Sequence, residues 1–212
     1  MAGWSTHSGR AIALPLHNVD TDQLIPARFM SASRSEGYGK FLLHDMRFDA
    51  DGAEIADFPL NRHEGASVLV AGRNFGSGSS REAAVYALVD AGITAVIAPN
   101  FGDIFASNAV NNGLLPARLP EHEVTQLIDS LADQSAAVLI DLRAGELRIG
   151  DQGYAFELDD SWRTKLINGW DDIDLTLNHE DQIQTFKDQR FQTTRWAWPA
   201  AQDQEPPSRR AQ

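Results

Sequence analysis

The sequence predicts a three-layer α/β domain, because two kinds of segment follow one another along its 212 residues. The central part has the order of a βαβ unit: an apolar run of strand length, a glycine loop, a helical pattern and a second apolar run. Such a unit has parallel strands and a right-handed crossover. The later part has short strands separated by glycine turns, which is typical of β-hairpins. A hydrophobic content of 42% over this length is enough for one sizeable core, so we expect a single domain.

The N-terminal part is expected to begin with a strand at residues 9–16. An Asx-rich turn with a proline stop follows at residues 18–26. Residues 31–39 are small and polar and include two glycines. They predict either a mobile loop that folds over a ligand or an ordinary surface connection.

The βαβ unit is expected to consist of a strand at 66–71, a loop at 72–80, a helix from Arg81 and a strand at 93–98. Ala84, Leu88 and Ala91 supply the apolar stripe of its helix. Later elements follow the same periodicity rules: a helix at 101–112, a strand at 114–118, a helix around 124–131, and short strands at 138–142, 146–149 and 154–158.

Toward the C-terminus, Asp160 or Ser161 is expected to cap a helix that ends near Gly169. Asn178 is expected to cap a last helix that runs toward Arg190. The rest is rich in proline and glutamine and has too little apolar content to pack. The predicted domain therefore spans residues 1–190, and residues 191–212 form a C-terminal extension that we expect to be disordered.

The charge of the chain disfavours polyanionic partners. Its formal net charge is -12, from 18 basic and 30 acidic residues, so a nucleic-acid or anionic-membrane surface is not expected. An anionic substrate would need a locally basic pocket. No stretch approaches the roughly 20 apolar residues of a membrane helix. Because the N-terminus also lacks the order of a signal peptide, we expect a cytoplasmic protein.

The chain has no cysteine, so it makes no disulfide and supplies no thiolate ligand or nucleophile. Any iron–sulfur cluster must be held by another chain. The six histidines are scattered without metal-ligand spacing, so no metal site is expected.

The segment from Gly72 to Glu82 has the composition of an anion pocket. It reads Gly-Arg-Asn-Phe-Gly-Ser-Gly-Ser-Ser-Arg-Glu. Glycines let backbone N–H groups approach a ligand, and the following helix N-terminus carries about half a positive charge toward the same point. In a purely structural interpretation, Ser79 or Ser80 only caps the helix and Arg81 lies on its solvated face. A nucleotide-binding loop is a third interpretation, but no lysine follows the glycines as in a P-loop. The Asx cluster at residues 18–22 is, by itself, typical of a turn.

Several motifs in order resemble a known family. They are Asn18-Val19-Asp20-Thr21-Asp22 with Pro26, Asn74-Phe75-Gly76 with Gly78-Ser79-Ser80-Arg81-Glu82, Asp103-Ile104-Phe105 with Asn108, Gly113-Leu114-Leu115-Pro116, Asn168-Gly169, and Asp172-Ile173-Asp174-Leu175-Thr176-Leu177. Together they resemble the swivelling domain of the aconitase superfamily, and more closely the separate small subunits of 3-isopropylmalate dehydratases. The resemblance covers residues 5–190 and implies a swivelling β/β/α domain in three layers.

This resemblance implies a hydro-lyase that is active only with a large subunit. The large subunit would hold a [4Fe-4S] cluster with one open iron, a Lewis acid toward the leaving hydroxyl, and this chain would bind no cofactor. The substrate would be a small dicarboxylate. The reaction would interconvert 2-isopropylmalate and 3-isopropylmalate through 2-isopropylmaleate in leucine biosynthesis.

The resemblance also implies roles for particular residues. Ser79 would abstract the proton alpha to a carboxylate, and Ser80 and Arg81 would bind the substrate or the serine oxygen. Asp22 would orient this network. Arg34 would hold a substrate carboxylate through a bidentate pair. The remaining substrate-binding positions would be Thr21, Gly76 and Gly78.

One residue departs from the family pattern, which usually reads Ser-Ser-Arg-Glu-His-Ala, because Ala83 stands in place of the histidine. Three interpretations stay open. The histidine is dispensable, or the chain acts on another malate derivative such as citramalate, a methylcitrate-type substrate or homocitrate, or the chain is a non-catalytic homologue that binds an anion or a partner.

Overall fold

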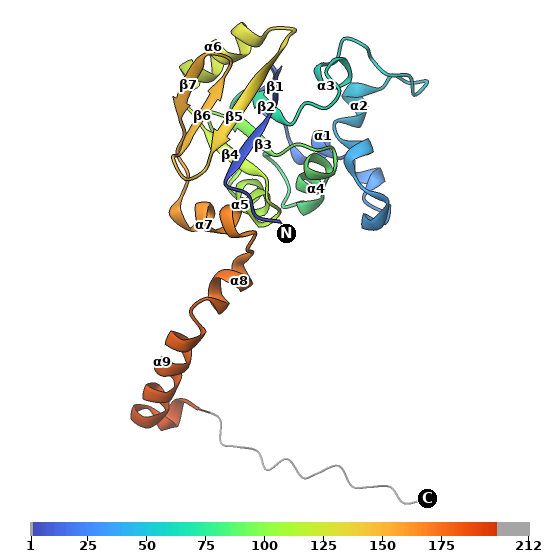
Figure 1. Ribbon diagram of the computed structural model, residues 1–212. Helices are drawn as coiled ribbons and strands as arrows, with labels where there is room; N and C mark the ends of the chain where they lie inside the picture. Colours follow the sequence, from blue (N-terminus) through green and yellow to red (C-terminus); the bar gives the residue numbers. More distant parts are fainter. Residues whose placement is uncertain (1, 199–212) are drawn as a thin grey trace, which may run out of the picture. The chain divides into compact units, whose positions relative to one another are not determined.

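The computed structural model describes residues 2–198. It divides into two units, Met1–Asp172 and Ile173–Gln212. The first unit holds the sheet (Figure 1) and the buried hydrophobic clusters.

The first unit is built on one curled sheet of seven strands in the order β4-β3-β2-β1-β5-β6-β7 (Figure 1). The strands are β1 (Thr6–Leu14), β2 (Val68–Ala71), β3 (Ala95–Ala98), β4 (Leu115–Arg118), β5 (Ser135–Asp141), β6 (Glu146–Ile149) and β7 (Gln152–Ala155). Strands β1 to β4 are parallel to one another, and β5 to β7 continue the sheet as antiparallel hairpins. The predicted combination of a βαβ unit with hairpins is confirmed.

Two cores flank the sheet because alternate residues of each strand point to opposite faces. Strands β2 and β3 are buried along their whole length, as expected for parallel strands covered on both faces. One core joins Ile12 and Leu69 to the helices α4 (Glu82–Asp90) and α5 (Asp103–Asn111). The other joins the opposite faces of the strands to α6 (Glu121–Leu131), α7 (Asp160–Asn168) and the hairpin strands. The predicted three-layer α/β domain is confirmed.

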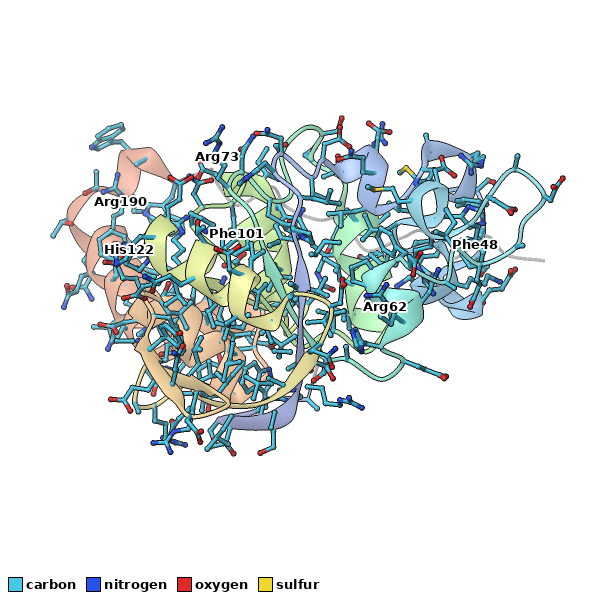
Figure 2. The ribbon with its side chains drawn as sticks, turned by 90° about the horizontal axis from the view of Figure 1, so that it is seen from above. Phe48, Arg62, Arg73, Phe101, His122 and Arg190 are labelled. Carbon is cyan, nitrogen blue, oxygen red and sulfur yellow. The ribbon has the colours of Figure 1, made fainter. Side chains whose placement is uncertain are left out.

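The segment between β1 and β2 lies on the face opposite α6. It consists of short helices: α1 (Thr21–Leu24), η1 (Ala27–Phe29), η2 (Arg34–Glu36), η3 (Gly39–Phe41), α2 (His44–Arg47) and α3 (Pro59–Arg62). Figure 2 shows Arg62 on α3 and Phe48 after α2 on one side of the sheet, and His122 on α6 on the other.

Three strands differ by three residues at one end from their predicted bounds. Strand β5 was predicted at 138–142 but spans Ser135–Asp141, because Ser135 pairs with Ile12 of β1. Strand β1 starts three residues before Gly9, because Thr6, His7 and Ser8 pair with β5, and it ends at Leu14 before Pro15. Strand β7 was predicted at 154–158 but spans Gln152–Ala155, because Gln152 pairs with Ile149 across a tight turn.

Two helix caps differ from their predicted positions: the cap of α7 lies one or two residues earlier than predicted, and that of α9 one residue later. The cap of α7 is Asp159, whose carboxylate accepts hydrogen bonds from the N–H groups of Ser161 (2.8 Å) and Trp162 (3.4 Å). The predicted caps Asp160 and Ser161 are therefore wrong. The residue at the N-cap of α9 is His179 and not Asn178, and it makes no capping side-chain bond.

The helix α8 (Asp172–Leu177) begins at the last residue of the first unit. The second unit continues with α9 (Glu180–Thr193) and η4 (Arg195–Ala197). The first unit ends at Asp172, whereas the sequence places the end of the domain at 190, and that boundary stays a prediction. Most of the predicted disordered extension, residues 199–212, lies outside the described residues. Within residues 2–198, no helix is long and apolar enough to cross a membrane.

Candidate active site

Three loops meet at the carboxyl edge of the parallel strands, where ligands of α/β sheets commonly bind. The loop after β1 lies along the loop after β2. The backbone hydrogen bonds between them include those from the N–H of Asn18 to the carbonyl of Arg73 (2.8 Å) and from the N–H of Thr21 to the carbonyl of Ser77 (2.9 Å). The two cluster motifs of the sequence are thus brought together.

The loop after β3 joins them from the other side. The N–H of Phe75 donates to the carbonyl of Asn100 (3.2 Å), and the N–H of Gly102 donates to the carbonyl of Phe75 (2.9 Å). Figure 2 shows Arg73 and Phe101 on these neighbouring loops. The loop after β2, which carries Ser79, is therefore held on both sides.

Gly76 fixes how closely this loop approaches α5. Its φ angle is +72°, and a Cβ atom there would lie 2.2 Å from a ring carbon of Phe105. A side chain would meet both backbone strain and a clash. The glycine therefore lets the loop that carries the serines pack directly against Phe105 of α5.

The serines follow in an exposed stretch next to the first loop. The backbone N–H of Ser79 donates to the hydroxyl of Thr21 (3.2 Å), and Thr21 is buried. Ser79 and Ser80 are both exposed. Thr21 is thus the buried support of Ser79.

Arg81 is tied to the first loop through an ion pair between its Nη1 and the carboxylate of Asp22. The Arg81 side chain is 24% exposed, so it does not lie on a solvated helix face. Arg81 is also the N-cap residue of α4, and no side chain caps this helix. The predicted capping by Ser79 or Ser80 is therefore wrong: the chain stays extended through Arg81, with φ -84° and ψ 103°, while Ser79 bonds to Thr21.

Arg34 belongs to η2 and contacts α4 at the end far from the serines. Its Nη1 pairs with the carboxylate of Asp90, the last residue of the helix, and its Cζ lies 4.4 Å from the ring centroid of Tyr86. Arg81 precedes the first residue of the same helix. The structure therefore brings Thr21, Asp22 and the serine loop together but holds Arg34 toward the far end of α4. Asp90 was not predicted as a site residue, because no local pattern connects it with Arg34, which lies 56 residues earlier.

Ala83 lies beside the site. It is half-buried and packs against the core that contains α4. Its neighbour Glu82 accepts a hydrogen bond from the side chain of Asn112 (2.9 Å).

The residues of this chain do not fit an iron–sulfur cluster, because the sequence has no cysteine to supply thiolates. Among the described residues, no group of three or more His, Asp or Glu side chains could hold a metal ion. A hollow of about 560 Å³ lies on the hairpins β5 to β7, and none of the predicted site residues lines it. Ser79 and Ser80 are exposed and lie away from this hollow.

The comparison with known families agrees with this fold and site. Residues 1–122 match the family described as the aconitase C-terminal domain. The chain is thus an α/β domain of the aconitase type.

Comparison with individual proteins assigns the chain to a particular family within this class. The chain is 45% identical over 189 residues to the 3-isopropylmalate dehydratase small subunit of Bacillus subtilis, covering 87% of this chain and 94% of that one. It is 44% identical over 200 residues to that of Paramagnetospirillum magneticum, covering 92% of this chain and 100% of the relative. The crystal structure of a 3-isopropylmalate dehydratase from Methanocaldococcus jannaschii superposes with a TM-score of 0.62 at 30% identity, covering 86% and 99% of the two chains. The chain belongs to the family of 3-isopropylmalate dehydratase small subunits.

Proposed function

We propose that this chain is the small subunit of a hydro-lyase that interconverts 2-isopropylmalate and 3-isopropylmalate, through 2-isopropylmaleate, in leucine biosynthesis. The observation that carries the proposal is the arrangement of the serine loop. Thr21 supports Ser79 and Asp22 pairs with Arg81, so two hydroxyls and a guanidinium lie together at the start of α4. Such a group suits a small dicarboxylate.

In this proposal Ser79 removes the proton alpha to a substrate carboxylate. A helix N-terminus stabilises an anion by up to about 2 kcal/mol, which is about one and a half pKa units at 1.36 kcal/mol each. That is too little to ionise a serine. Arg81 and backbone donors must add to it, and their effect grows when water is excluded.

Ser80, Gly76 and Gly78 would bind the substrate beside Ser79. Gly78 has a φ angle of +102°, a conformation that few L residues adopt, so it lets the chain turn immediately before the serines. Arg34 would bind a substrate carboxylate, since its planar fork matches two oxygens.

The exposed serine loop also supports a second chain that completes the site. We propose that this chain is a large subunit, that it holds the [4Fe-4S] cluster, and that the complex is cytoplasmic. The cluster would act as a Lewis acid on the leaving hydroxyl. The absence of cysteine from this sequence supports that division, because thiolates usually hold such clusters.

Ala83 favours a second candidate, in which the chain acts on another malate derivative or binds an anion without catalysis. Ala83 is half-buried beside Glu82, so this position of the site carries a methyl group in place of the family's imidazole. The serines and Arg81 are kept, so catalysis remains the favoured function.

The test is reconstitution with a large subunit. The two chains are purified together, the cluster is rebuilt without oxygen, and turnover of isopropylmalate, citramalate, homocitrate and citrate is compared. Fastest turnover of isopropylmalate supports the proposal. Faster turnover of another substrate would assign the chain to the dehydration of that substrate. No turnover of any of the four substrates would support a binding role without catalysis. The single chain, treated in the same way, should show no iron–sulfur absorbance.

A further inference from the structure

Asp90 joins the loop at residues 31–39 to α4 through two contacts. Its Oδ2 pairs with Nη1 of Arg34 and accepts a hydrogen bond from the backbone N–H of Tyr38 (2.7 Å). The Asp90 side chain is only 17% exposed. One oxygen of this carboxylate thus holds both a side chain and the backbone of the segment between residues 31 and 39.

The rest of the loop closes around this point. The Tyr38 hydroxyl donates to the carbonyl of Ala32 (2.9 Å), and the Tyr38 ring lies 6.2 Å from that of Tyr86. A Cβ atom on Gly39 would lie 2.5 Å from the carbonyl oxygen of Asp90, so only a glycine allows the loop to approach so closely. The loop is therefore docked on α4 by contacts of its own residues.

The docked Arg34 packs on the face of α4 that begins at Glu82, directly after the serine loop. Glu82, Tyr86 and Asp90 are spaced four residues apart on α4, so they form one row along the helix. Tyr86 lies about 6 Å along the axis from Glu82, at 1.5 Å per residue. Side chains on a helix lean toward its N-terminus, so the Tyr86 ring that carries Arg34 leans toward Arg81.

Asp90 uses only part of the guanidinium. Arg34 has five N–H donors, and its contact with Asp90 is through Nη1. The Cζ atom lies over the Tyr86 ring at 4.4 Å, which restrains the plane of the guanidinium. The remaining donors can meet a carboxylate while Asp90 fixes where the group lies.

We propose that Asp90 is a positioning residue for substrate binding, which acts through Arg34 by holding the loop and its guanidinium against α4. This inference rests on the proposed function for its substrate. The anchoring itself does not, and it can be measured on the single chain.

The first experiment measures the anchor by limited trypsin digestion of the single chain, which reports cleavage after Arg34. Asp90→Asn should raise the cleavage rate about tenfold or more, because it weakens a hydrogen bond to a charged group. Asp90→Glu should restore part of the protection. Asp129→Asn, on the exposed side of α6, is the matched control and should leave the rate unchanged. An unchanged rate for Asp90→Asn would refute the anchor.

The second experiment measures the steady state of the reconstituted complex. Asp90→Asn should raise KM about tenfold with kcat changed less than about threefold, and Asp90→Glu should recover part of the loss. In the Arg34→Lys background, Asp90→Asn should add little, because the two residues act as one unit. An equal effect in both backgrounds, or a KM that falls, would overturn the positioning role. A wild-type complex that turns over no substrate refutes the proposed function and this role with it, while the digestion rates still decide the anchor.

Discussion

The guanidinium of Arg81 donates a hydrogen bond to the carboxylate of Asp22, which lies 59 residues earlier in the chain. The pair joins the loop after β1 to the start of α4. It therefore fixes Arg81 next to the two serines. It also links the Asx cluster at residues 18–22 with the serine loop, which are separate motifs in the sequence.

Asp22→Asn should weaken this link and impair the chemistry more than the fold. We expect kcat/KM of the reconstituted complex to fall about 10- to 100-fold, as for loss of a hydrogen bond between charged groups worth about 1.5–3 kcal/mol. The free energy of unfolding should change by less than about 1 kcal/mol, because an exposed ion pair contributes little. Steady-state kinetics and denaturant unfolding measure the two effects. Wild-type kcat/KM in this variant would show that Asp22 has no part in the site.

Gly76→Ala should destabilise the domain by two effects. A positive φ at a residue with a side chain costs about 1–3 kcal/mol. The clash with the Phe105 ring adds about 1–3 kcal/mol of overpacking. Gly150→Ala is the matched control, because Gly150 has a φ angle of +57° but nothing within 4 Å of a Cβ atom. Denaturant unfolding of both variants isolates the clash, and equal losses of stability would contradict the role assigned to Phe105.

His7 should make the stability of the domain depend on pH. Partial burial lowers the pKa of His7 from its usual 6.5, and its Nε2 lies 2.8 Å from the Ser67 hydroxyl. The unfolded chain therefore binds the proton more readily than the folded chain. This contribution to stability is complete above the unfolded pKa of 6.5 and is lost as the pH falls from there through the lower folded pKa.

The corresponding measurement is the free energy of unfolding between pH 5 and pH 8. His7→Gln should flatten its slope below about pH 6.5. His122→Gln, on the exposed side of α6, is the control and should keep the wild-type slope. A slope that persists in His7→Gln would assign the pH dependence to other groups.

The periodicity of the sequence predicted the sheet and its main helices, because apolar runs such as 66–71 and 93–98 leave few alternatives to buried parallel strands. It did not predict helix starts to the residue. Asp159, Asp160 and Ser161 are all good capping residues, and only the bonds that Asp159 makes distinguish them. Capping side chains compete locally, so tertiary contacts decide between neighbours.

For the site, the motifs indicated Thr21, Asp22 and the serine loop, and the structure places these residues together. Asp90 carried no local signal of its contact with Arg34, because the two are 56 residues apart. The mobile-loop interpretation of residues 31–39 assumed that only a ligand or a partner would fix Arg34. A long-range ion pair of this kind depends on how the loop packs on α4, which the residue pattern does not contain.

Ser79→Ala is the most direct test of the proposed function. The substitution should leave the free energy of unfolding within about 0.5 kcal/mol of wild type, because Arg81 and not a serine is the N-cap residue of α4. A large loss of activity would therefore be chemical. Ser80→Ala is the matched control, since both serines are exposed and adjacent.

The measurement is solvent exchange of the alpha proton of isopropylmalate by the reconstituted complex, with equal cluster content in each variant. We expect Ser79→Ala to lower the exchange rate by at least about a hundredfold, the usual contribution of a general base, and Ser80→Ala to lower it less. Near wild-type exchange in Ser79→Ala with a large loss in Ser80→Ala would place the base one residue later. Near wild-type exchange in both variants would contradict the serine mechanism for this chain.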